Sequence, residues 1–209
     1  MRDLILKMSV SLDGFVGGPN GEIAWIFKSR DPGATAWTID TLRQTGVHIM
    51  GSRTFRDMAA YWPTSTEPFA PPMNEIPKVV FSRTGAVDAA ATTKALQDAT
   101  RLRKDGNAPA NPATAASWTN PGIASGDLAE EIARLKQQPG KPILAHGGAG
   151  FARSLVRHGL IDEYRLLIHP VALGHGLPLF SELPKPMDLK LVGATSFDGG
   201  AVAHIYRPA

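Results

Sequence analysis

The sequence of 209 residues contains no cysteine. This absence excludes disulfide bonds, cysteine-ligated zinc, iron–sulfur clusters and a thiol nucleophile, and it is typical of a reducing compartment. The chain also lacks an uninterrupted apolar run of about 18 residues, which a membrane-spanning helix needs. Lys7 interrupts the apolar N-terminal run and no small-residue cleavage site follows, so a signal peptide is not expected. We therefore expect a cytoplasmic protein with no membrane partner.

The motifs of several enzyme and binding classes are also missing. Lysine and arginine are spread along the chain without a block, so the net charge of +3 does not indicate nucleic-acid binding. No pair of histidines has a metal-binding spacing such as H-x-x-x-H, and we expect no metal site. The G-x-S-x-G motif of hydrolases, the P-loop and the G-x-G-x-x-G fingerprint are all absent. A small molecule is the partner that remains.

The composition is that of a globular protein, with 43% hydrophobic and 20% charged residues, which excludes wholesale disorder or a fibre. The length suits one mid-sized α/β domain over residues 1–209. Between Thr84 and about Gly122, alanine, threonine, proline and asparagine dominate. We interpret residues 86–116 as a loop insertion, with a short helix near 93–104.

Apolar runs and turn residues predict strands that alternate with helices. Strands are expected at 4–10, 47–50, 78–82, 142–146, 163–169, 189–195 and 202–206. Helices are expected at 36–44, at 51–60, from the Asp127 cap to about Gln138, and between the glycines at 147–150 and Gly159. Prolines 63, 68, 71, 72 and 77 predict no regular structure between them. This order implies a largely parallel sheet that ends in an antiparallel pair.

The first chemical signal lies at residues 50–54 (MGSRT), where a strand ends and a helix begins. Free backbone N–H groups and the helix dipole favour an anion at such a position. Gly51 permits close approach of the backbone, Thr54 carries a hydroxyl, and Arg53 can pair with a phosphate. A plain turn with a solvated arginine remains the alternative.

Two further strand ends carry similar residues. Residues 146–151 (HGGAGF) again place glycines between a buried strand and a helix, although tight turns need glycine for steric reasons alone. Ser82 and Arg83 end the third strand, and a hydroxyl beside a guanidinium can hold a phosphate monoester. Because parallel strands end at one edge of the sheet, we expect all three sites to contribute to one diphosphate-binding site.

Three other residues are weaker candidates. Asp13 follows the first strand in a glycine-rich turn, where it either caps the turn or lies beside the substrate as a proton source. Trp25 is interpreted as a core or pocket-wall aromatic. His175, between two glycines, is the histidine most open to a ligand.

In this order and spacing, the motifs resemble the dihydrofolate-reductase-like superfamily, and more narrowly the stand-alone relatives of the C-terminal reductase domain of RibD in riboflavin biosynthesis. The motifs are SLDGF at 11–15, MGSRT at 50–54, VVFSR at 79–83, HGG at 146–148 and GHGLPLF at 174–180. The resemblance implies a three-layer, doubly wound α/β fold, with a mostly parallel sheet, antiparallel C-terminal strands and NADPH across the strand ends. A homodimer is also implied.

The resemblance assigns cofactor contacts residue by residue. It implies Gly51, Ser52, Arg53 and Thr54 at the cofactor phosphates; Ser82 and Arg83 at the adenosine 2′-phosphate; Gly147, Gly148, Ala149, Gly150 and Phe151 around the pyrophosphate; and Ser9, Val16 and Gly17 beside the nicotinamide.

The sequence also departs from the resembled enzymes. Dihydrofolate reductases carry an acid on the first helix, whereas the matching stretch at 33–36 has none, and Asp31 and Asp40 only flank it. The H-x-E and P-C-x-x-C motifs of the deaminase often fused to RibD reductases are absent. We expect an NADPH-dependent reductase of a small heterocyclic substrate, related to 5-amino-6-(5-phosphoribosylamino)uracil reductase. The alternatives are a nucleotide-binding protein without catalysis and a divergent dihydrofolate reductase.

Overall fold

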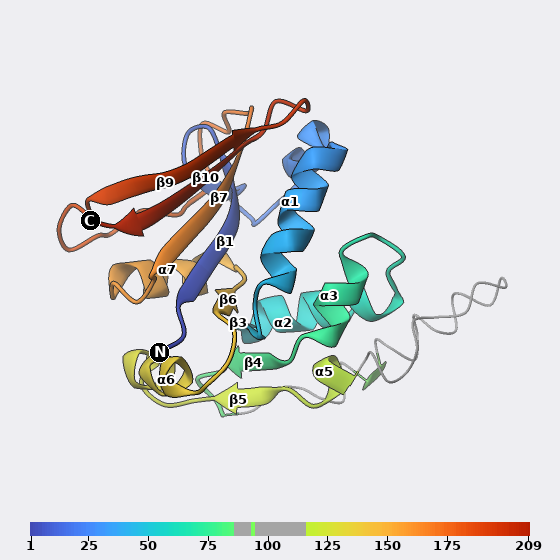
Figure 1. Cartoon of the computed structure of the whole chain (residues 1–209), viewed down its shortest axis with the longest axis vertical. Coiled ribbons are helices and arrows are strands. Elements are labelled where there is room, and N and C mark those ends of the chain that lie inside the picture. The colour runs from blue at the N-terminus through green and yellow to red at the C-terminus, as the bar shows by residue number, and fades with distance from the viewer. Residues whose placement is uncertain (86–92, 95–115) are drawn as a thin grey trace, which may run out of the picture.

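The computed structural model describes residues 1–85, 93–94 and 116–209. It has three layers, with an eight-stranded sheet between two groups of helices (Figure 1). The first six strands of the sheet, from β5 at one edge to β7, pair in parallel, and β10 runs antiparallel to both of its neighbours, β7 and β9. The predicted fold class is confirmed. In spatial order the strands are β5 (Gly122–Ala124), β4 (Lys78–Phe81), β3 (Val47–Gly51), β6 (Ile143–Ala145), β1 (Leu4–Ser11), β7 (Glu163–His169), β10 (Val202–Pro208) and β9 (Leu189–Ser196).

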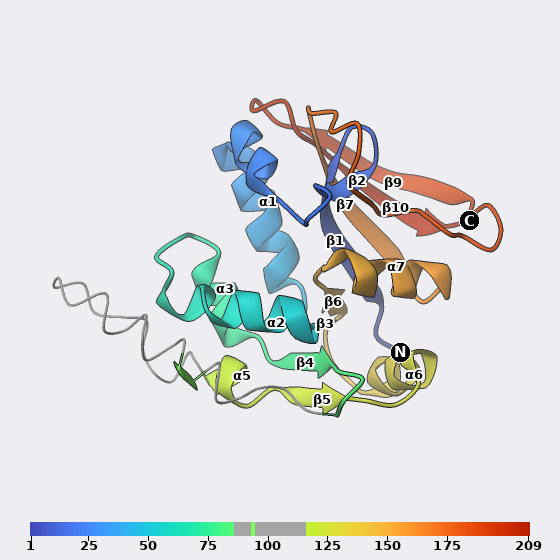
Figure 2. The ribbon, with the colours of Figure 1, turned by 180° about the vertical axis from the view of Figure 1, so that it is seen from behind.

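Helices cover both faces of the sheet (Figures 1 and 2). One face carries α1 (Pro32–Arg43), α2 (Ser52–Ala59), α3 (Ala70–Glu75) and α5 (Ala116–Thr119). The other carries α6 (Leu128–Gln137) and α7 (Ala149–Arg157). None of the described helices is long and apolar enough to cross a bilayer. The 3-10 helices η1 (Ala24–Ser29) and η2 (Trp62–Thr64) precede α1 and α3, and β2 (Phe15–Gly17) pairs with β8 (Leu177–Pro178).

Strand β1 divides the core between the two layers because alternate side chains point to opposite faces. Leu4, Leu6 and Met8 pack in the core cluster that includes α6 and α7, whereas Ile5 packs in the cluster that includes α1 and α2. Lys7 shares the face of Ile5. A charged side chain therefore points toward α1 and α2 from the centre of the sheet.

The predicted strands and most helices are confirmed, but the proline-rich segment is a correction. Helix α3 forms there, with Pro71 and Pro72 in its first turn. Proline is tolerated at that position because the first N–H groups of a helix have no intrahelical acceptor. Helix α1 also starts at Pro32, four residues before the prediction, because the Asp31 carboxylate caps it by accepting the Ala34 N–H at 2.9 Å.

Two elements that the sequence did not predict, helix α5 and strand β5, precede the Asp127 cap of α6. Trp118 anchors this stretch, since it is fully buried against Phe55. The predicted helix at 93–104 and the insertion at 86–116 lie outside the described residues, except for 93–94 and 116.

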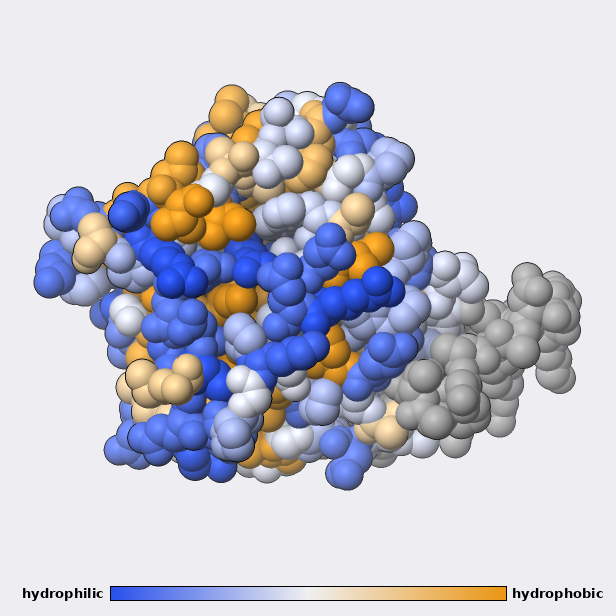
Figure 3. Space-filling model, viewed as in Figure 1, coloured by the Kyte–Doolittle hydropathy of each residue, from blue (hydrophilic) through white to orange (hydrophobic). Residues whose placement is uncertain are grey.

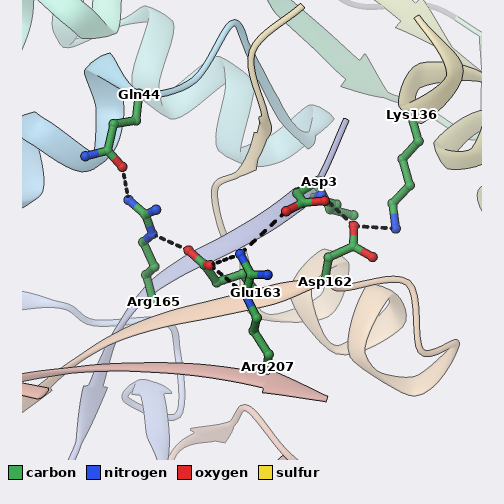
Figure 4. A network of polar contacts seen from close by, with 8 residues as sticks. Asp3, Gln44, Lys136, Asp162, Glu163, Arg165 and Arg207 are labelled. Atoms are coloured by element: carbon green, nitrogen blue, oxygen red, sulfur yellow. Dashed lines mark hydrogen bonds and ion pairs between the residues drawn. The ribbon is translucent and has the colours of Figure 1, made fainter. Parts of the chain in front are cut away.

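A network of ion pairs ties the amino ends of β1 and β7 to β10 and α1 (Figure 4). The Glu163 carboxylate accepts hydrogen bonds from Arg165 Nε at 2.7 Å and from Arg207 at 2.8 Å. Arg165 also donates to Gln44 at 2.7 Å. Burial raises the pKa of Glu163, but the two arginines outweigh it and lower the pKa overall. The network holds the sheet at the amino ends of β1 and β7 and leaves their carboxyl ends open for a ligand.

Candidate functional site

A cleft of about 1630 Å³ opens at the carboxyl ends of the parallel strands. Its volume exceeds the roughly 300–1,000 Å³ typical of a pocket for one drug-sized ligand, and it is large enough for a cofactor with a substrate. The fourteen residues predicted to bind the cofactor all line this cleft. They are Ser9, Val16, Gly17, Gly51, Ser52, Arg53, Thr54, Ser82, Arg83, Gly147, Gly148, Ala149, Gly150 and Phe151.

The two glycine-containing junctions contact each other directly. The Gly148 N–H donates to Thr54 Oγ1 at 2.7 Å, so the Thr54 hydroxyl already serves as an acceptor within the protein. A Cβ on Gly148 would lie 3.0 Å from the same Oγ1, and one on Gly147 would lie 3.1 Å from Met8 Cε. The two glycines therefore allow close packing between α2, α7 and β1, and a larger residue would make Met8 or Thr54 shift. The Gly147–Gly148 peptide bond is cis.

The helices that begin at these junctions have no side-chain caps. The N-cap residues Gly51 of α2 and Gly148 of α7 have no side chain to cap the first turn, and among the described residues only the Gly148 N–H has a side-chain acceptor, Thr54 Oγ1. By contrast, Asp31 caps α1 and Asp127 caps α6, the latter by accepting from Ala129 and Glu130. Uncapped N–H groups and the positive end of the helix dipole favour an anion. Both of these helix ends line the cleft.

Cations surround these helix ends. Arg53 and Arg83 line the cleft as predicted, and Arg153 of α7 joins them together with Ser154. Sequence reasoning missed Arg153 and Ser154. Their spacing from Gly150 was the available signal, because residues three and four positions apart share one helix face.

Three nitrogen-bearing side chains form the floor of the cleft. Lys7, His146 and His169 all line it and come from β1 and the ends of β6 and β7. Leu6 of β1 pairs with Ala145 of β6, so Lys7 and His146 each follow that pair on adjacent strands. Sequence reasoning missed all three as ligand contacts. The signal for Lys7 was its position as the sole charge within the apolar β1 run.

Burial shapes the protonation of this floor. It lowers the pKa of Lys7 to about 8. Burial, assisted by the Lys7 charge, lowers the pKa of His146 to about 3 and that of His169 to about 4. Both imidazoles are therefore neutral at pH 7, and the Nε2 atom of each has no hydrogen-bond partner among the described residues.

Asp13 does not line the cleft. Its carboxylate accepts from the Ser11 hydroxyl at 2.6 Å and from the backbone N–H groups of Leu173 and Gly174 at 3.1 and 2.7 Å. The hydrogen bonds, led by that of Ser11, lower the pKa of Asp13 to about 2. These contacts match the turn-capping alternative and give no support to Asp13 as a proton source.

The two other pocket candidates also lie outside the residues that line the cleft. Trp25 is buried, donates from Nε1 to the Glu22 carbonyl at 3.0 Å, and packs edge-on against His169. It therefore supports the cleft floor from behind, as the core interpretation predicts. His175 is exposed in the loop before β8.

No carboxylate of α1 is free at the cleft. Asp31 lines it, but its two oxygens accept the backbone N–H groups of Ala34 and Gly199 at 2.9 and 2.8 Å. These hydrogen bonds lower the pKa of Asp31, so it stays ionised. Asp40 is exposed and does not line the cleft. Within residues 1–85, 93–94 and 116–209, no group of histidines and acids has the arrangement of a metal site.

Comparison with known proteins gives consistent results. The sequence profile of the RibD C-terminal domain matches residues 2–203. The chain is 32% identical over 206 residues to YyaP of Bacillus subtilis (strain 168), covering 99% of this chain and 95% of that one. YwjB of the same organism is 27% identical over 206 residues, covering 99% and 98%.

Solved structures have the same fold. A pyrimidine reductase-like protein from Corynebacterium diphtheriae matches with a TM-score of 0.62 at 15% identity, covering 100% of this chain and 92% of that one. The diaminohydroxyphosphoribosylaminopyrimidine deaminase/5-amino-6-(5-phosphoribosylamino)uracil reductase of Thermotoga maritima matches with a TM-score of 0.64 at 16% identity, covering 100% and 57%.

Proposed function

The chain belongs to the RibD C-terminal domain family, and from this membership and the cleft geometry we propose that it is an NADPH-dependent reductase of a small heterocyclic substrate. The observation that carries the proposal is the pair of uncapped helix ends at adjacent strands. The N-termini of α2 and α7 meet through the Gly148–Thr54 hydrogen bond and open into one cleft. Such an arrangement suits a diphosphate better than a single anion.

The residues present fit NADPH. Arg53 and Arg153 accompany the uncapped N–H groups, and the glycines at 147–148 pack closely against Met8 and Thr54 where the two helices meet. Ser82 and Arg83 would hold the adenosine 2′-phosphate. When bound, NADPH supplies a hydride.

Lys7 is the residue that we assign to the reacting end of the substrate. It lies on the cleft floor in the same strand as Ser9, and no described carboxylate pairs with it. An ammonium in a partly dry site stabilises negative charge that develops on the acceptor oxygen or nitrogen as hydride arrives at the adjacent carbon. The neutral imidazoles of His146 and His169 line the same floor, with their Nε2 atoms buried away from solvent.

The proposed function is tested by calorimetric titration with NADPH, and separately with NADH, in a buffer without phosphate. We expect NADPH to bind at micromolar concentration and NADH much more weakly, because only NADPH engages Ser82 and Arg83. Arg53→Ala should weaken NADPH by about 1.5–3 kcal/mol, the range for a hydrogen bond to a charged group.

Arg43→Ala is the matched control, since Arg43 is exposed at the end of α1 and does not line the cleft. Its NADPH affinity should equal that of the wild type. Absence of binding to either dinucleotide would refute the proposed function. Binding without reduction of any pteridine, flavin or pyrimidine compound would favour the non-catalytic alternative.

A further inference from the structure

The cleft has two halves of different chemistry. Three arginines, Arg53, Arg83 and Arg153, lie at the strand–helix junctions that would hold the cofactor. The opposite half, formed by η1, α1, the end of α2, η2 and α3, carries a group of large apolar side chains beside the polar Ser29, Thr35 and Thr38. The apolar side chains are Ile23, Ile26, Phe27, Met58, Trp62, Phe69 and Met73.

Several of these apolar side chains are open to water. Ile23 and Phe27 of the η1 segment are 50% and 54% exposed, and Tyr61 at the start of η2 is 48% exposed. Trp62 and Phe69 pack against the core cluster behind them, with ring centroids 6.2 Å apart. Trp62 and Phe69 thus form one apolar wall of this half and Ile23 and Phe27 another, and a flat ligand that covers them would remove both walls from water.

The charges at the mouth of this half neutralise one another. Arg30 donates to Glu67 at 2.7 Å and lies over the Phe27 ring, 5.1 Å from its centroid. The Tyr61 hydroxyl donates to the other oxygen of Glu67. This Arg30–Glu67–Tyr61 group links the segment after η1 to the segment between η2 and α3. The Glu67 carboxylate therefore offsets the charge of Arg30, which pairs through Nη2.

A phosphate monoester has few partners in this half. It carries about −1.5 to −2 charges at pH 7 and is held by more than one charge-assisted hydrogen bond in protein sites. Lys7 supplies one cation at the floor, and Arg56, exposed on α2 one turn beyond Arg53, lies at the rim. Among the described residues from Ile23 to Arg43 and from Tyr61 to Glu75, Arg30 is the sole cation that lines the cleft, and it pairs with Glu67.

We propose, resting on the reductase function above, that the substrate is a flat, largely apolar ring compound without a phosphate group, held by the two apolar walls. Its polar end meets Lys7 on the cleft floor. This substrate class differs from the phosphoribosyl compound named for the Thermotoga maritima enzyme.

The test uses two probes that share a ring and differ in one phosphate, 1-naphthol and 1-naphthyl phosphate. Binding is measured by calorimetry on protein saturated with NADP+, so that the cofactor half is occupied. Both probes gain free energy from burial of the ring, but 1-naphthyl phosphate also loses free energy by desolvation of its unpaired phosphate. We therefore expect 1-naphthol to bind at least about tenfold more tightly than 1-naphthyl phosphate. Phe27→Ala should weaken 1-naphthol about tenfold.

Two variants sharpen the test. Leu191→Ala is the matched control, since Leu191 is an equally exposed apolar residue, at 50%, that does not line the cleft. It should leave both affinities unchanged. Glu67→Gln removes the carboxylate that pairs with Arg30, so that the guanidinium can bind the phosphate of 1-naphthyl phosphate. The difference in affinity between the two probes should therefore become smaller. A purely structural role of Glu67 would not change this difference.

Equal or tighter binding of 1-naphthyl phosphate would overturn the inference. If Arg56→Ala then abolished the binding of 1-naphthyl phosphate, the phosphate would be assigned to Arg56 at the rim. Failure of both probes to bind would overturn it as well. The same two probes are also titrated into an Arg53→Ala/Arg83→Ala variant without NADP+. This variant lacks two of the arginines in the cofactor half, so the probe affinities can be compared even if NADP+ does not bind. Failure of the reductase proposal, seen as absent NADPH binding, is thereby distinguished from failure of the substrate class.

Discussion

At the scale of single residues, Lys7 departs most from its surroundings. It is the one charged residue of β1, and its neighbours Leu6 and Met8 are buried in the core on the opposite face. Burial costs a charged group free energy unless something compensates it. No described carboxylate pairs with Lys7, so its burial lowers the stability of the fold. Such positions are frequent in functional sites.

Lys7→Met should reduce the single-turnover rate of hydride transfer from NADPH about 10²–10³-fold, the range for loss of one charge-stabilising donor. Because burial lowers the pKa of Lys7 to about 8, the ammonium is present below that pH and is lost above it. The rate should therefore fall as the pH rises through about 8. Lys7→Arg, which stays charged, should remove this pH dependence.

The pKa itself can be measured without a substrate. Reductive methylation with ¹³C-formaldehyde labels the lysines for NMR, and the signal missing from Lys7→Met identifies Lys7. A midpoint near the ordinary lysine pKa of about 10.4 would contradict the burial that we assign to this side chain.

At the scale of elements, Lys78 attaches α5 to the rest of the fold. Its ammonium donates to the backbone oxygens of Met73 and Ile76 and to Ser117 Oγ, and it lies 4.3 Å from the Trp118 ring centroid. Burial lowers the pKa of Lys78 to about 7. The lysine thus links β4, α3 and α5 at the edge of the sheet.

Lys78→Met should lower the free energy of unfolding by about 1–3 kcal/mol, because it leaves buried carbonyl oxygens without a donor. Urea denaturation followed by tryptophan fluorescence measures this change. Lys190→Met is the matched control, since Lys190 is an exposed strand lysine on β9, and it should change stability by less than about 0.5 kcal/mol. Equal stability of the two variants would show that Lys78 does not hold α5.

At the scale of the whole molecule, β9 is an open edge of the eight-stranded sheet. Leu191 and Val192 on this strand are 50% and 48% exposed, and Figure 3 shows hydrophobic residues gathered over β9 and β10. An exposed apolar edge strand favours pairing with another chain. Together with the family resemblance, this surface supports the predicted homodimer.

Sedimentation velocity at micromolar concentration should therefore show a species of twice the chain mass. Val192→Glu should shift it toward the monomer, because a buried unpaired charge is costly at an interface. Ile123→Glu, at a 44% exposed position on β5, is the matched control and should remain dimeric. A monomeric wild type would refute the homodimer.

The sequence predicted the order of strands and helices because its signals are local. The apolar run of β1, the Asp127 cap and the left-handed Gly159 at φ 63° each act within a few residues. The same locality explains the errors. Pro71 and Pro72 were interpreted as breakers, yet in the first turn of α3 they cost little.

The candidate cofactor site could also be predicted in its outline, because parallel strands end at one edge and their following residues must lie close together. What only the tertiary structure decided is which side chains are free to act. Asp13 and Asp31 have their oxygens occupied by distant backbone N–H groups, at Gly174 and Gly199 respectively. Lys7 and His146 acquired their altered pKa values through burial. Partners and solvent exposure depend on contacts between remote segments, so the sequence determined where the chemistry could gather and the fold determined which residues are left to perform it.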